Sequence, residues 1–172
     1  NGCSTDTLYY SVTQPLPLVF SVSITDVSCY GLSDGTAAIT PSGGVSPYQI
    51  DWNGEDPNNL SVGDYIINII DNNACLKTDT INIIQPDEIT IITNVNEPSC
   101  FGYSNGEITG SAIGGNGGMF TFFPNWNDLG SIDAGTYTIV ATDINGCTST
   151  PLDVIVDEPN ELTLTLTNVI DV

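Results

Sequence analysis

Apolar and polar residues alternate along several short stretches of this sequence. In residues 135–142, Tyr137, Ile139 and Ala141 fall on one side and threonines fall on the other, and Tyr65 to Ile69 repeat this alternation. A period of two residues is typical of a half-buried antiparallel strand. Asp-, Asn- and Gly-rich turns separate such stretches, so the pattern predicts an all-β chain.

The same landmarks recur in the same order at intervals close to 72 residues. Cys3, Cys75 and Cys147 are 72 residues apart. Other landmarks recur at intervals of 71 to 74 residues: Gln14-Pro15, Gln85-Pro86 and Glu158-Pro159, then Ser28-Cys29 and Ser99-Cys100, Tyr65 and Tyr137, Trp52 and Trp126. Such internal similarity indicates tandem repeats.

The phase of the landmarks divides the chain into four parts. We predict two full repeats, residues 16–86 and 87–158. We expect residues 1–15 to be the last strand of a preceding repeat and residues 159–172 the first strand of a following one, so that the sequence is part of a longer chain.

Each repeat is long enough to form a small sandwich domain. The order of strands and turns predicts tandem immunoglobulin-like antiparallel β-sandwiches of about six or seven strands each. Trp52 and Trp126 are expected on the third strand of each repeat, and Tyr65 and Tyr137 on the penultimate strand. We expect these aromatic side chains to pack in the cores rather than to form a sugar-stacking platform.

Charge restricts the partners. The net charge is −20, and Lys77 is the only basic residue. Binding to nucleic acid or to an anionic membrane requires basic side chains, so we expect no nucleic-acid partner. No apolar run is long enough to predict direct membrane insertion. The acidic residues predict a solvated surface, with cation binding as the alternative.

Composition also argues against catalysis. The sequence contains no histidine, and its single basic residue is a lysine. The commonest general base and the usual clamps for oxyanions and phosphoryl groups are therefore missing. A pair of carboxylates could still hydrolyse glycosides, but the spacing of the acidic residues singles out no pair. We predict that the chain is not an enzyme and needs no cofactor.

Five cysteines suggest disulfides. The repeat phase predicts the pairs Cys29–Cys75 and Cys100–Cys147, with the partner of Cys3 outside this sequence. Zinc would need four close Cys or His ligands, which two cysteines per repeat cannot supply. Free buried thiols are the other alternative. Disulfides would place the chain in an oxidising, extracellular compartment.

These motifs together resemble the SprB repeat. The pattern is Cys-aromatic-Gly-x-x-Asp/Asn-Gly, then Gly-Gly, an aromatic followed by Trp, Ala/Val-Gly-x-Tyr, and Asp-x-Asn-Gly-Cys. It runs from Cys29 to Cys75 and again from Cys100 to Cys147. Two departures are small: Ala74 replaces glycine before Cys75, and the stretch from Phe120 to Trp126 is longer than its counterpart.

The resemblance implies a location and a role. SprB repeats occur in very long cell-surface proteins of Bacteroidetes, including gliding-motility adhesins. It therefore implies export by type IX secretion, display on the cell surface, and service as a filament, adhesin or stalk. The implied partners are neighbouring repeats of the same chain, other filament chains or surface glycans.

A few residues are candidates for modification or for binding ions. Asp6-Thr7-Leu8 and Asp79-Thr80-Ile81 resemble the O-glycosylation sites of Bacteroidetes, so Thr7 and Thr80 are candidate acceptors. Oxygen atoms of four turn residues could bind Ca²⁺, although the same residue types are the usual formers of turns: Asp34, Asp71, Asp143 and Asn145.

Two functions fit this sequence. The repeats form a structural spacer that projects a distal head, or they are a carbohydrate-binding module. For the second function the candidate contact residues are Tyr30, Phe101 and Tyr103, which lie outside the predicted core set.

Overall fold

The structure is a computed structural model that describes residues 8–165 and 167. The chain forms two compact units. Unit 1 contains Ser33–Ile84 and the described part of Asn1–Val27, and unit 2 contains Ser28–Leu32 and the described part of Gln85–Val172. The short segment 28–32 therefore belongs to unit 2, although the residues on either side of it belong to unit 1.

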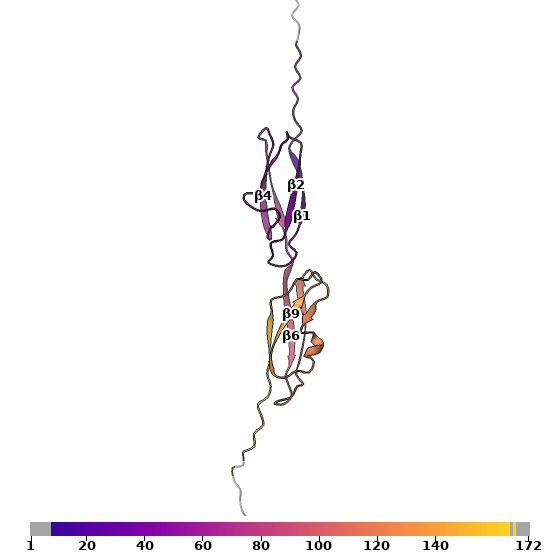
Figure 1. Ribbon diagram of the computed structural model, residues 1–172, viewed down its shortest axis with the longest axis vertical. Coiled ribbons are helices and arrows are strands. Elements are labelled where there is room, and N and C mark those ends of the chain that lie inside the picture. Colours follow the sequence, from indigo (N-terminus) through magenta and orange to yellow (C-terminus); the bar gives the residue numbers. More distant parts are fainter. Residues whose placement is uncertain (1–7, 166, 168–172) are drawn as a thin grey trace, which may run out of the picture. The chain divides into compact units, whose positions relative to one another are not determined.

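Unit 1 consists of two antiparallel sheets (Figure 1). The first sheet pairs β1 (Val19–Thr25) with β2 (Thr36–Ser42). The second has the order β3-β4-β5, formed by β3 (Gln49–Asp51), β4 (Gly63–Ile70) and β5 (Leu76–Ile83).

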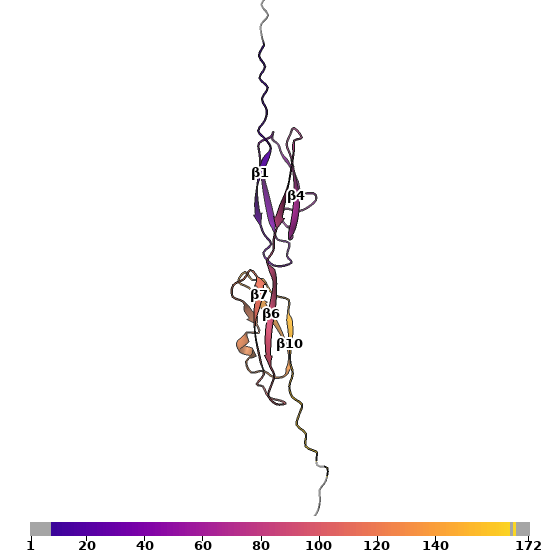
Figure 2. The same ribbon diagram turned by 180° about the vertical axis from the view of Figure 1, so that it is seen from behind.

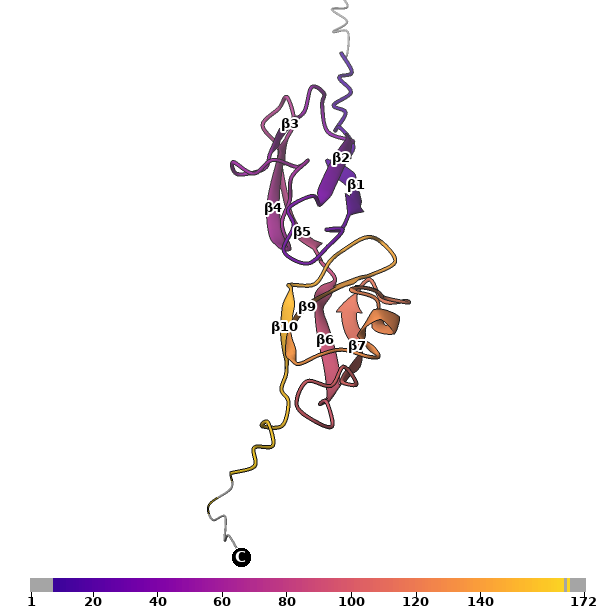
Figure 3. The same cartoon turned by 60° about the horizontal axis from the view of Figure 1, so that its bottom comes forward.

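Unit 2 repeats this topology strand for strand. Its first sheet pairs β6 (Asp87–Asn96) with β7 (Glu107–Gly115). Its second has the order β10-β9-β8, formed by β8 (Thr121–Phe123), β9 (Gly135–Thr142) and β10 (Leu152–Val156). In Figures 2 and 3, β6 lies between β7 and β10.

The core of unit 1 lies between its two sheets. Ile67 and Ile69 of β4 and Ile83 of β5 are fully buried, and they share a cluster with Ala37 of β2. Phe20 of β1 packs against the same cluster. Because side chains alternate across a strand, one face of each sheet supplies the core and the other faces solvent.

The core of unit 2 is built in the same way. Ile139 and Ala141 of β9 are fully buried, as the alternation in residues 135–142 predicts. Tyr137 packs against this core, and its hydroxyl donates to the carbonyl of Asp133. In unit 1 the hydroxyl of Tyr65 likewise donates to the carbonyl of Ser61. The predicted role of the two tyrosines as core anchors is confirmed.

The prediction of an all-β, antiparallel sandwich chain is confirmed, but some details differ. Each unit has five strands in the described residues instead of six or seven. Isolated bridges, among them Gly35 with Leu60 and Gly106 with Ile132, lie outside these strands. The immunoglobulin-like topology stays a prediction.

The tryptophans also differ from expectation. Trp52 follows β3, and Trp126 begins a short 3-10 helix, η1 (Trp126–Leu129), because the extra residues after β8 form this turn. Both rings still pack against the cores. Within the described parts of residues 1–15 and 159–172 the chain forms no strand. That these segments complete the sheets of neighbouring repeats stays a prediction.

Candidate functional site

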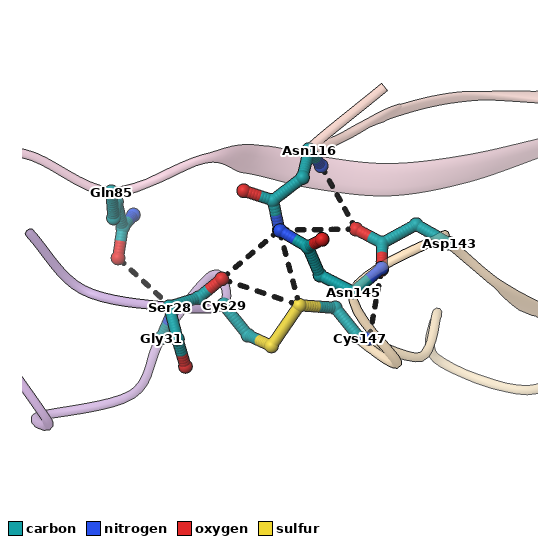
Figure 4. Close-up of a disulfide and its surroundings, with 8 residues drawn as sticks. All are labelled: Ser28, Cys29, Gly31, Gln85, Asn116, Asp143, Asn145 and Cys147. Atoms are coloured by element: carbon teal, nitrogen blue, oxygen red, sulfur yellow. Dashed lines mark hydrogen bonds between the residues drawn. A yellow bond between two sulfur atoms is a disulfide. The ribbon is translucent and has the colours of Figure 1, made fainter. Parts of the chain in front are cut away.

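The segment 28–32 forms a tight turn that is held by unit 2. The N–H of Leu32 donates to the carbonyl of Cys29 at 3.2 Å. Gly31 has φ +76°, a left-handed conformation that favours glycine. Its N–H donates to the side-chain oxygen of Gln85 at 3.0 Å (Figure 4). The turn thereby directs the side chain of Cys29 into unit 2.

A disulfide joins Cys29 to Cys147, and the two residues are 118 positions apart in sequence. Their Cα atoms are 5.6 Å apart, a separation usual for disulfides. Cys147 is 6% exposed and shares a buried cluster with Ile89 and Ala141, against which Cys29 packs. The bridge is therefore part of the core of unit 2.

Asp143 organises the turn that carries Cys147. Its Oδ1 accepts hydrogen bonds from the N–H groups of Asn145 and Cys147, each at 2.9 Å. Its Oδ2 accepts one from the N–H of Asn116, also at 2.9 Å. The carboxylate is buried, at 5% exposed, yet three backbone donors point at it. These donors fix the position of the sulfur atom of Cys147.

Asn116 connects the turn to the segment 28–32 (Figure 4). Its side-chain NH2 group lies 3.0 Å from the carbonyl oxygen of Ser28, 3.2 Å from Oδ2 of Asp143 and 3.3 Å from Sγ of Cys147. The Ser28 oxygen and Sγ of Cys147 are also 3.3 Å apart. That last pair is a contact only, because a disulfide sulfur carries no hydrogen to donate.

The predicted pairs Cys29–Cys75 and Cys100–Cys147 are wrong. Cys29 pairs with Cys147, and Cys75 and Cys100 are exposed free thiols. The physical reason is that the chain leaves unit 1 after Val27, which is buried there, so Cys29 belongs to unit 2 together with Cys147, whereas Cys75 belongs to unit 1. The disulfide joins a cysteine of the first predicted repeat to one of the second. Cys3 lies outside the described residues.

Unit 1 contains the same turn around Cys75. Oδ1 of Asp71 accepts hydrogen bonds from the N–H groups of Asn73 and Cys75, at 2.9 and 2.8 Å. Its Oδ2 accepts one from the N–H of Val45 at 2.9 Å. Ala74 adopts φ +62° where Gly146 adopts φ +87° in unit 2. Val45 occupies the position of Asn116 but has no side-chain amide.

The two aspartates are held in the charged state. Hydrogen bonds, chiefly from the N–H of Cys75, lower the pKa of Asp71, while partial burial opposes this. The N–H of Asn116 is the main cause that lowers the pKa of Asp143. Hydrogen bonds to a carboxylate favour its ionised form. These contacts give both residues a structural role in the turns.

The calcium hypothesis for Asp34, Asp71, Asp143 and Asn145 stays a prediction. Asp34 and Asn145 are exposed, whereas the two other side chains face backbone N–H groups. Across residues 8–165, no group of three or more Cys, Asp or Glu side chains gathers in a way that could hold a metal ion.

The remaining candidates lie apart from the disulfide or beside it on the surface. Thr80 is exposed on β5, so its hydroxyl is accessible, whereas Thr7 lies outside the described residues. Tyr30, Phe101 and Tyr103 are 51%, 50% and 57% exposed. They are therefore not core residues, as predicted, and their contact with glycans stays a prediction.

Sequence reasoning missed Gln85 and Asn116, the two side chains that hold the segment 28–32. One signal was present for the first: Gln85 and Glu158 recur beside the proline at each repeat boundary, and both accept a glycine N–H of the Ser-Cys turn. Asn116 corresponds to Val45 in the first repeat, which has no side-chain amide, so repetition could not reveal its role.

Comparisons with known proteins support the resemblance to the SprB repeat. The SprB repeat model matches residues 21–57. Neither the curated proteins nor the solved structures include a significant match to the chain. SprB repeats are structural repeats that occur in cell-surface proteins. Among the described residues, no helix is long and apolar enough to cross a membrane. Residues 21–57 are therefore similar to a SprB repeat.

Proposed function

We propose that this chain is a tension-bearing spacer within a long exported surface protein, where tandem repeats form a stalk or filament used in adhesion or gliding. The proposed location is extracellular, and type IX secretion is the export route that the family resemblance implies. The observation that carries the proposal is the covalent link between Cys29 and Cys147.

The link changes how a pulling force passes through the molecule. A force applied before residue 29 and after residue 147 follows the disulfide and bypasses residues 30–146. Fully extended, a segment of that length would span about 400 Å. The disulfide therefore prevents most of the chain from lengthening under load, which is what a stalk of fixed length requires.

The surface charge supports a spacer as well. With a net charge of −20 and one basic residue, neighbouring copies repel one another. Such a surface resists non-specific association and keeps a stalk solvated.

Single-molecule force spectroscopy tests the proposal. The chain is held by handles attached before Cys29 and after Cys147 and is pulled with and without a reductant. We expect the oxidised chain to show no extension from residues 30–146 and the reduced chain to lengthen by about 400 Å. Cys29→Ser should behave like the reduced chain in both conditions, while Cys100→Ser should behave like the parent. Equal extension of the oxidised and reduced parent would overturn the proposal.

A carbohydrate-binding module is the second candidate, favoured by the exposure of Tyr30, Phe101 and Tyr103. Aromatic faces that are open to solvent can stack on sugars. A glycan array probed with the oxidised chain tests this role. Binding that is lost in Tyr30→Ala and Phe101→Ala would support it, and an array without binding favours the spacer.

A further inference from the structure

We propose that Cys75 and Cys100 are halves of two further disulfides between repeats, each built like Cys29–Cys147. In this arrangement, the turn around Cys75 receives a Ser-Cys-aromatic-Gly loop from the repeat before it. The loop that carries Cys100 binds the corresponding turn of the repeat after it. The inference rests on the proposed tandem organisation.

The turn around Cys75 makes the same backbone hydrogen bonds as the turn around Cys147, to which the loop with Cys29 is bound. The carbonyl of Cys75 accepts the N–H of Asp71 at 3.1 Å, and that of Cys147 accepts the N–H of Asp143 at 2.9 Å. Gly44, with φ +56°, lies against the carboxylate of Asp71. Gly115, with φ +57°, lies in the same way against Asp143. The receiving geometry is therefore already formed in unit 1.

A pocket of about 210 Å³ lies beside the Cys75 thiol. Pro17, Leu18, Gly44 and Cys75 are among the residues that line it. Their counterparts in unit 2 line a pocket together with Cys29 and Tyr30: Glu88, Ile89, Gly115 and Cys147. The loop with Cys29 and Tyr30 forms one wall of the unit 2 pocket, and it thus indicates what would lie against the equivalent residues of unit 1.

The loop around Cys100 matches the loop around Cys29. The N–H of Tyr103 donates to the carbonyl of Cys100 at 3.2 Å, as Leu32 does to Cys29. Gly102 has φ +73°, and its N–H donates to the carboxylate of Glu158 at 2.6 Å, as Gly31 does to Gln85. Cys100 is exposed. The loop around Cys100 therefore already has the conformation in which the loop around Cys29 binds the turn of Cys147.

Bond formation needs an oxidant, and we assign this role to the disulfide of a thiol–disulfide oxidoreductase. One cysteine thiolate attacks that disulfide, breaks its S–S bond and releases one oxidoreductase thiolate. The second repeat cysteine, as a thiolate, then attacks the sulfur of the first repeat cysteine in the mixed disulfide. This step forms the disulfide between the repeats and releases the second oxidoreductase thiolate. The repeat cysteines lose two electrons and two protons, and the oxidoreductase dithiol gains both.

A peptide offered to the intact chain tests the receiving site. The probe is residues 97–104, linked through its cysteine to glutathione, and the control is a scrambled peptide linked in the same way. Attack by Cys75 joins the peptide to the chain and releases glutathione. Mass mapping compares the two free thiols of the chain, so Cys100 serves as the internal control.

We expect the natural peptide to modify Cys75 about tenfold more than Cys100, and the scrambled peptide to lose this preference. The nearby carboxylate of Asp71, with some burial, raises the pKa of the Cys75 thiol, so reactivity alone does not favour this site. Equal modification of the two thiols by the natural peptide, or of Cys75 by both peptides, would overturn the inference.

A chain with two copies tests both halves together. Residues 16–172 are appended after Pro159 of a first copy, which keeps the repeat phase. Under oxidation we expect a link from Cys100 of the first copy to Cys75 of the second, in addition to Cys29–Cys147 in each copy. Free Cys100 and Cys75 at that junction would overturn the inference. That result would leave the force experiment on Cys29–Cys147 unaffected, so the two proposals can fail separately.

Discussion

The backbone N–H of Cys147 donates a hydrogen bond of 2.9 Å to the carboxylate of Asp143, four residues earlier in the chain. In unit 1 the N–H of Cys75 donates to Asp71 at 2.8 Å. The same acid thus fixes the cysteine in both units, although only one of these cysteines forms a disulfide in this chain. The turn is therefore present both with the disulfide and without it.

This relationship makes stability dependent on pH. The pKa values of Asp71 and Asp143 are lower in the folded chain than the ordinary value of 3.8. Their contribution is therefore present above pH 3.8 and is lost as the pH falls through the folded-state pKa. We expect the free energy of unfolding, measured with denaturant, to be constant near neutral pH and to fall below about pH 4.

Asp143→Asn tests the source of that dependence. The amide cannot replace the charge, so the variant should be less stable at pH 7 and should lose less stability on acidification. Asp157→Asn, at an exposed position, is the control and should keep the parent's pH profile. A parent-like profile in Asp143→Asn would contradict the assignment.

Loss of the disulfide should destabilise unit 2. Closing a loop of 118 positions restricts the unfolded chain, and such bridges typically contribute about 2–4 kcal/mol. We expect Cys29→Ser, Cys147→Ser and the double variant to lose the same amount in thermal unfolding. Cys75→Ser should change nothing in this chain, because that thiol is free. A larger loss in the double variant than in either single variant would show that the bridge is not the cause.

Ala74 and Gly146 offer a reciprocal test of backbone strain. Both residues adopt positive φ, at +62° and +87°. A side chain in the left-handed region costs about 1–2 kcal/mol, and glycine avoids most of this cost. Ala74→Gly should therefore stabilise unit 1 by about 1 kcal/mol, and Gly146→Ala should destabilise unit 2 by a similar amount. Hydrogen exchange of β4 and β9 assigns each change to its unit, and changes of equal sign would contradict this explanation.

Asn116→Val should weaken the hold on the segment 28–32. The variant keeps the backbone hydrogen bond to Asp143 but removes the amide contact with the carbonyl of Ser28, at a cost of about 1 kcal/mol. We expect the disulfide to be reduced faster by dithiothreitol. Asn96→Val, whose amide contacts Glu107 instead, is the matched control and should leave the rate unchanged.

The fold could be predicted from this sequence because its signals are local. The alternation around Ile139 and the recurrence of Tyr65 as Tyr137 depend on residues that are close in sequence, and the structure places them as expected. The 3-10 helix at Trp126 was missed because a few extra residues can form either a longer strand or a turn, and their composition does not decide between the two.

The disulfide pairing could not be predicted because it depends on where the chain leaves a unit. The repeat phase offers Cys29 a partner at Cys75 or at Cys147, and only the segment 28–32 distinguishes them. That segment is positioned by Gln85 and Asn116, which are distant in sequence. Long-range contacts of this kind leave no period in the sequence.

The bond between Cys29 and Cys147 also determines what a protease can achieve. A cut at any peptide bond between these two residues divides the backbone but leaves both fragments joined through sulfur. In the proposed surface location, the chain would meet extracellular proteases, and exposed loops are where these enzymes cut. Damage of that kind would leave the two ends of this chain connected, so its continuity does not depend on an intact backbone between residues 29 and 147.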